Sequence, residues 1–292
     1  MVFIIFRLFC EVFAVRVAKP INNNIVSVHD ENGQEIVVMG RGIGYKAKSG
    51  DDIPGHLVEK IFRMSSQNEI ERLKELLSSV PQAHIDVTAE IIAYAAQHLE
   101  KRLNESIYLT LTDHISFSIN RLQQGMHFHS TLLSEIRQFY PEEYAIGKYG
   151  LQLIEQQTGL ILPKEEAASI ALHIINAEYD TTVSDSYYIT RLVDSIASLL
   201  KEEAGIALEE QAFFTERFLT HLKYLTRRVI KKEPLPPPQD ATLYTLMKGA
   251  YPVAVAQAER IAGYIEESQQ YTLSTDEISS LAIHIKKITD TQ

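Results

Sequence analysis

The sequence has little cysteine and no tryptophan. Cys10 is the one cysteine among 292 residues, so a disulfide within the chain and a zinc site of several thiolates are both excluded. Glycine and proline are also scarce, at 13 and 10 residues, which excludes collagen-like and low-complexity classes. We therefore expect a packed protein of two or three domains in a reducing, cytoplasmic setting.

Long apolar runs are absent as well. The most apolar stretch, MVFIIFRLFCEVFA at residues 1–14, is interrupted by Arg7 and Glu11 and is too short to span a bilayer. It also lacks the basic start of an export signal. We predict that translation starts at Val15, that residues 1–14 are an extension outside the native product, and that the chain has no stable membrane insertion.

Positive charge is in short supply. Lys and Arg number 28 against 38 Asp and Glu, a formal charge of −10, which excludes a protein that coats nucleic acid indiscriminately. Residues 1–55 hold six basic and six acidic side chains, so the rest of the chain carries the whole excess. A nucleic-acid role, if there is one, belongs to the N-terminal part.

The pattern of apolar residues changes near Asp51. Before it, the segments VRVAKPI, IVSVH, EIVVM and GYKAK alternate like strands between Asn and Gly turns, and Asn32-Gly33 is the strongest hairpin signal. After it, segments from HLVEKIF onward carry apolar residues at helical spacing. We predict a multidomain α+β protein: a small antiparallel sheet, dimeric because it is too small to be stable alone, followed by all-α helical bundles.

The helical part contains an internal repeat. Tyr140-Pro141 precedes His173 by 33 positions, and Tyr251-Pro252 precedes His284 by the same 33. Further matched pairs are His114 with His221, Arg121 with Arg228, Glu166 with Glu277, and Ser169 with Ser280. We therefore predict two homologous helical domains, 79–184 and 185–292, each with two matched histidines.

Several roles are open to these histidines. They can be hydrogen-bonded core residues. A metal site is disfavoured, since two histidines fall short of the three protein ligands usual in catalytic zinc sites. An enzyme is disfavoured because a Gly-rich phosphate loop, a GxSxG elbow and a nucleophilic cysteine are all missing. Neutral imidazole can instead accept a phosphoryl group near pH 7, and the added charge can switch an interface.

Three N-terminal segments carry a resemblance: RVAKPINNN at residues 16–24, VMGRGIGY at 38–45 and KSGDD at 48–52. Together with the duplicated helical domains, they resemble the BglG/SacY/LicT family of transcriptional antiterminators, over everything from Val15 onward. The resemblance implies a dimeric co-antiterminator RNA-binding domain at 15–70 and two phosphotransferase-system (PTS) regulation domains at 79–184 and 185–292.

The resemblance also implies a function. Similar proteins bind an imperfect hairpin in the leader RNA, prevent terminator formation and so activate a sugar-utilisation operon. Phosphorylation of the first regulation domain by a sugar-specific enzyme II is inhibitory, and phosphorylation by HPr, typically on the second, is activating. Catalytic activity, a cofactor and a metal are not expected.

The family's functional residues carry over to positions of this sequence. The resemblance assigns RNA binding to a set of groups that suit recognition of loops and bulges. They are the amide of Asn24, the guanidinium fork of Arg41, the aromatic face of Tyr45, the glycine Gly40 and the cation of Lys19. Phosphorylation falls on His114, His173, His221 and His284. We expect Asn22 and Asn23 to form the turn, Arg121 and Arg228 to make salt bridges, and His98, His127 and His129 to be surface or packing residues.

Two alternatives stay open. One is a DNA-binding transcription activator with the same regulation domains, disfavoured because the N-terminal part lacks a helix-turn-helix pattern. The other is a histidine-based metal enzyme.

Overall fold

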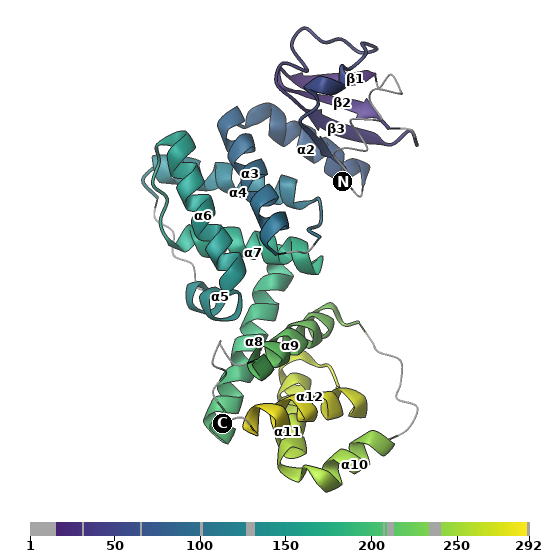
Figure 1. Cartoon of the computed structure of the whole chain (residues 1–292), viewed down its shortest axis with the longest axis vertical. Helices are drawn as coiled ribbons and strands as arrows, with labels where there is room; N and C mark the ends of the chain where they lie inside the picture. Colours follow the sequence, from purple (N-terminus) through teal and green to yellow (C-terminus); the bar gives the residue numbers. More distant parts are fainter. Residues whose placement is uncertain are drawn as a thin grey trace. The chain divides into compact units, whose positions relative to one another are not determined.

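The computed structural model describes residues 16–30, 32–64, 66–99, 102–126, 132–206, 208, 213–233 and 241–290. The predicted extension at 1–14, His127, His129 and the proline-rich segment 234–238 lie outside these ranges. The chain forms two compact units (Figure 1): residues 1–130 with 142–180, and residues 131–141 with 181–292.

The first unit begins with a four-stranded antiparallel sheet. Its strands are β1 (Val17–Asn22), β2 (Ile25–His29), β3 (Glu35–Met39) and β4 (Lys60–Phe62), paired in chain order. Gly33, at φ +76°, supplies the left-handed turn residue between β2 and β3 that the Asn-Gly pair predicts. The predicted small antiparallel sheet is confirmed.

Two predicted segments are wrong. Residues 44–48 form turns rather than a strand, since Tyr45 N–H bonds back to Gly42 O and Ala47 N–H to Gly44 O. Residues 56–62 are not an amphipathic helix: a short 3₁₀ turn η1 (Gly55–Leu57) leads into β4. The apolar spacing of HLVEKIF mimics a helix, but pairing of β4 with the edge of β3 overrides it.

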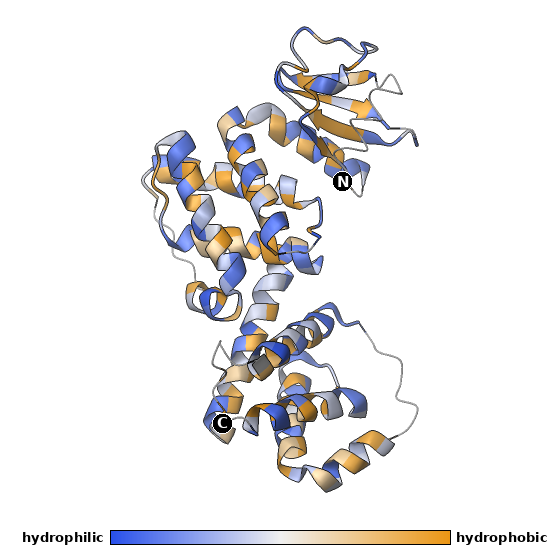
Figure 2. Cartoon of the chain, viewed as in Figure 1, coloured by the Kyte–Doolittle hydropathy of each residue, from blue (hydrophilic) through white to orange (hydrophobic). Residues whose placement is uncertain are grey.

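Helices cover the sheet and form the bundle of the first unit. They are α2 (Gln67–Ser79), α3 (Gln82–His98), α4 (Ile107–Gln123), α6 (Pro141–Thr158) and α7 (Glu165–Tyr179). The strands are largely apolar in Figure 2. One face of the sheet packs through Ile25 and Val37 against Leu73 of α2. The other face is covered by Ile43 and Ile53.

The second unit is all-α. It contains α5 (Leu133–Phe139), α8 (Val183–Ala204), α9 (Phe213–Lys231), α10 (Thr242–Ala250), α11 (Pro252–Gln269) and α12 (Thr275–Thr289). Although α5 belongs in sequence to the first repeat, it packs on α8, and Glu135 of α5 pairs with Arg191 at 3.0 Å. The sheet followed by helices confirms the predicted fold class. Within the described ranges, none of the helices is long and apolar enough to cross a bilayer.

Candidate RNA interface and histidine sites

The turn between β1 and β2 and the loop after β3 form one surface, made of residues 22–24 and 40–47, which we call the turn platform. Gly40 N–H bonds to Asn24 O at 2.9 Å, and Gly44 N–H bonds to Asn23 O at 3.0 Å. The Asn24 side chain adds a third link, because its Oδ1 accepts from Gly42 N–H at 2.9 Å. The two segments are therefore fixed to each other by backbone and side-chain hydrogen bonds.

Two glycines of the turn platform are required by packing. A Cβ at Gly40 would lie 1.7 Å from the carbonyl oxygen of Leu57, and one at Gly44 would lie 2.0 Å from that of Asn22. Any residue with a Cβ would therefore clash with a backbone carbonyl at either position. The resemblance assigns Gly40 to RNA binding, and the structure shows that packing against Leu57 also requires a glycine at this position.

Four of the five predicted RNA-binding residues lie on the turn platform, and Gly40 is one of them. Asn24 fastens the platform, Arg41 is exposed, and Tyr45 is 62% exposed with the Lys46 ammonium 5.3 Å from its ring centroid. The platform thus offers a guanidinium, an aromatic face and an ammonium to solvent side by side. Lys19 lies elsewhere, exposed on β1 beside a groove lined by Glu71 and Lys74 of α2.

Asn22 has a structural role. Its Oδ1 accepts from the Asn24 backbone N–H at 2.8 Å, which closes an Asx turn, and its Nδ2 donates to Leu77 O at 3.0 Å. The prediction that Asn22 forms the turn is confirmed.

The first matched histidines lie next to each other, with their rings tilted by 38°. His114 on α4 and His173 on α7 have ring centroids 4.8 Å apart. His114 Nε2 donates to Glu166 Oε2 at 3.1 Å, because a carboxylate oxygen only accepts, and Ser118 Oγ donates to the same oxygen at 3.1 Å. Arg121 completes the set by pairing with Glu166 Oε1. A buried carboxylate therefore orients the imidazole of His114.

Burial and neighbouring groups together set the charges of this site. It would raise the pKa of Glu166, but the hydrogen bond from His114 and the charges of His114 and Arg121 lower the pKa below its ordinary value. Burial, and next the charge of His114, lower the pKa of His173 to about 3. At neutral pH the site holds an ionised Glu166 and a neutral His173.

The second matched histidines repeat the arrangement. His221 on α9 and His284 on α12 are stacked with ring centroids 4.7 Å apart. Arg228 Nη2 pairs with Glu277 Oε1 at 2.5 Å. Burial, and next the charge of His284, lower the pKa of His221 to about 4, while burial followed by the charges of Lys287 and Arg217 lowers the pKa of His284. The predicted salt bridges of Arg121 and Arg228 are both confirmed.

The two sites differ in what holds the first imidazole. In the second site, Ser280 Oγ lies 3.0 Å from His221 Nε2. The counterpart of Ser118, four residues after the histidine, is Leu225. Sequence reasoning matched the histidines but missed Ser118, although its position one helical turn after His114 was the available signal.

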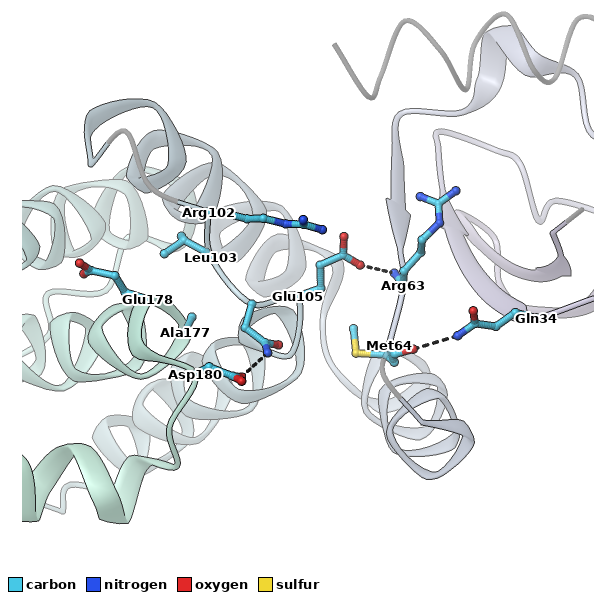
Figure 3. Close-up of a pocket in the computed structure, with 10 residues that line it drawn as sticks. Gln34, Arg63, Met64, Arg102, Leu103, Glu105, Ala177, Glu178 and Asp180 are labelled. Carbon is cyan, nitrogen blue, oxygen red and sulfur yellow. Dashed lines mark hydrogen bonds between the residues drawn. The ribbon is translucent and has the colours of Figure 1, made fainter. Parts of the chain in front are cut away.

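A further pocket of about 450 Å³ in the first unit contains none of the predicted site residues (Figure 3). Glu105 Oε2 accepts from Arg63 N–H at 3.0 Å, Gln34 Nε2 donates to Met64 O at 3.1 Å, and Asn104 Nδ2 donates to Asp180 at 2.6 Å. Hydrogen bonds between the lining residues thus hold the wall of this pocket together. Among the residues described here, no three His, Cys, Asp or Glu side chains are grouped to hold a metal ion.

Known proteins and domain families match both the sheet domain and the two helical repeats. The CAT RNA binding domain matches residues 15–71, and the PRD domain matches residues 89–177 and 194–288. Transcription antiterminator LicT of Bacillus subtilis (strain 168) is 39% identical over 274 residues, 94% of this chain and 99% of LicT. The beta-glucoside operon antiterminator of Dickeya chrysanthemi is 38% identical over 94% of this chain and 96% of its own. The crystal structure of GlcT CAT-PRDI, 35% identical, superposes with a TM-score of 0.52 on 57% of this chain and 99% of its own.

Proposed function

Because this chain belongs to the LicT/BglG-type transcription antiterminators, which join a CAT RNA-binding domain to PRD domains, we propose that its target is a leader-RNA hairpin. Binding of the hairpin prevents the overlapping terminator from forming. Transcription then continues into a sugar-utilisation operon. The domains are 15–70, 79–184 and 185–292, and the protein works as a cytoplasmic homodimer without catalytic activity or cofactor.

The turn platform is the observation that carries this proposal. Its exposed groups suit RNA, whose sequence is read at loops and bulges by stacking and hydrogen bonding. Tyr45 supplies the stacking face, Arg41 the guanidinium fork for phosphates or base edges, and Asn24 an amide. Gly40 keeps the platform in shape against Leu57, and Lys19 contacts the RNA backbone.

We further propose that the matched histidines accept phosphoryl groups from the phosphotransferase system. His114 and His173 receive them from a sugar-specific enzyme II, which inhibits, and His221 and His284 receive them from HPr, which activates. A depressed pKa supports this role, because it keeps His173 and His221 unprotonated and therefore nucleophilic at neutral pH. The bond between phosphorus and the phosphorylated side chain of the donor protein breaks as a bond from phosphorus to a ring nitrogen here forms.

Binding of RNA is tested with the full chain. A hairpin is obtained by in-vitro selection on the wild-type protein from a library with randomised internal loops. We expect Arg41→Ala to weaken binding about tenfold or more, as loss of a guanidinium contact to a base or phosphate does. Arg137→Ala, an exposed arginine on α5, is the matched control. Equal affinity of the two variants contradicts the assignment of Arg41.

Phosphorylation is tested with radiolabelled phosphoenolpyruvate, enzyme I and HPr, with and without the membrane fraction containing enzyme II. We expect label in the wild type and in His98→Gln, the control at an exposed histidine. Replacement of all four matched histidines by glutamine is expected to abolish the label. Undiminished label in that variant contradicts the assignment.

A further inference from the structure

The side chain of Asn24 joins the turn platform to helix α3. Its Oδ1 accepts from Gly42 N–H, so its Nδ2 faces the other way and donates to Gln82 Oε1 at 3.3 Å. Gln82 is oriented in turn, because its Nε2 donates to Asp86 Oδ1 at 2.9 Å. A backbone N–H at one end and a carboxylate at the other leave a single assignment of both amides. One of the two N–H donors of the Asn24 amide is therefore already used within the protein.

Gln82 begins a polar stripe along one face of α3. Gln82, Asp86 and Glu90 follow each other at intervals of four residues, which places them on the same side of the helix. Burial lowers the pKa of Lys60 in β4, while the charges of Asp86 and Glu90 act in the opposite direction. The stripe thus contacts a hydrogen-bond donor of the sheet domain, Asn24, directly and acts on Lys60 through its charge.

The stripe is also tied to the helical bundle. Glu90 accepts from Tyr149 Oη at 3.5 Å and from Gln157 Nε2 at 3.2 Å, both on α6. Helices α3, α4, α6 and α7 share one hydrophobic core, and α4 and α7 carry His114 and His173. A movement of α3 would therefore change its contact with Asn24 and also its packing in the bundle that holds the first histidine pair.

We propose that the stripe of Gln82, Asp86 and Glu90 occupies the Asn24 amide with which the sheet domain contacts RNA, so that α3 and RNA compete for Asn24. The chemistry of the stripe resembles that of the ligand: an amide oxygen takes the place of a base acceptor, and two carboxylates take the place of phosphates. The inference deepens the proposed function and rests on it.

Competition has a measurable consequence. If α3 and RNA compete, the apparent affinity for RNA is the intrinsic affinity multiplied by the fraction of molecules in which α3 does not hold Asn24. Removing one neutral hydrogen bond changes such an equilibrium about threefold to tenfold. Loss of the Gln82 side chain is therefore expected to strengthen RNA binding, whereas a glutamine that merely supports Asn24 would weaken binding when lost.

The experiment compares Gln82→Ala with Gln97→Ala in the full chain, using the hairpin selected on the wild type. Gln97 is an exposed residue of the same helix, so the two substitutions share their cost in helix propensity and entropy. We expect Gln82→Ala to bind about threefold to tenfold more tightly than wild type and Gln97→Ala to bind equally. Equal or weaker binding by Gln82→Ala overturns the proposal.

A double-mutant cycle locates the effect. Asn24→Asp keeps the acceptor for Gly42 N–H and so preserves the turn platform, but it removes the donor to Gln82. The gain from Gln82→Ala is expected to vanish in the Asn24→Asp background. A gain that persists there overturns the role of Asn24 in the competition.

Failure of the proposed function gives a different result from failure of the competition: no hairpin is then selected by the wild type or by Gln82→Ala.

Discussion

Arg228 pairs with Glu277 in the second helical repeat at the positions where Arg121 pairs with Glu166 in the first. Each arginine lies seven residues after the first histidine of its repeat, and each glutamate seven residues before the second. Both carboxylates are buried. An ion pair at fixed spacing thus ties together the two helices that present each histidine pair.

Breaking the first of these pairs is expected to be costly. Arg121→Ala leaves Glu166 buried without its guanidinium partner, and we expect it to lower the free energy of unfolding by about 3–5 kcal/mol. Urea titration followed by circular dichroism measures the change. The double variant Arg121→Met with Glu166→Leu, which replaces both charges, is expected to recover most of the loss. A single variant within 1 kcal/mol of wild type contradicts a structural role of about this size.

Stability is expected to fall in acid because of His173. The pKa of His173 is about 3 in the folded chain and about 6.5 when unfolded, so the unfolded state binds the extra proton between these values. Stability is therefore full above pH 6.5 and is lost as the pH falls. His173 accounts for about 2 kcal/mol of loss at pH 5.

Urea unfolding of wild type and His173→Gln at pH 7.5 and 5.0 tests this. The variant should lose less stability between the two pH values, and His56→Gln, at an exposed histidine, should behave as wild type. An identical pH dependence for His173→Gln and wild type contradicts the expectation.

Alanine at two glycines should have opposite effects. Gly40→Ala drives a Cβ into the Leu57 carbonyl and is expected to destabilise the sheet domain by about 3 kcal/mol or more. Gly263→Ala, within α11 and with nothing within 4 Å of the new Cβ, is expected to stabilise by about 0.5–1 kcal/mol. Thermal unfolding of the two variants and of the wild type measures both changes in stability. A folded, unperturbed Gly40→Ala protein would show that the loop yields easily.

The start of α12 supports the second histidine site. Ser274 Oγ accepts from Glu277 N–H at 3.3 Å, and Ser274 N–H donates to Glu277 Oε2 at 2.9 Å, which is a capping box. Ser274→Ala is expected to cost about 1 kcal/mol in urea unfolding, and Ser274→Asp, which can still cap, much less. Equal losses in the two variants would exclude the cap as the cause.

The sequence predicted those features that depend on local pattern or on duplication. Alternation and an Asn-Gly turn identified three of the four strands, and the repeat placed four histidines and two arginines in equivalent positions. Local pattern failed at β4, where helical spacing in HLVEKIF competes with pairing to β3. It also could not reveal the contact between Asn24 and Gln82, which are 58 residues apart and meet only in the folded chain.

Helix α5 has a consequence for the order of events during synthesis. Ile136 and Phe139 are buried in the unit that contains α8, and Ile189 of α8 follows Phe139 by 50 residues. At bacterial or slower translation rates that interval takes roughly 3–10 s. During this time the apolar face of α5 has been synthesised but its partner helix has not. Packing of α5 into its core therefore waits until the ribosome has passed the whole of the first repeat and entered α8.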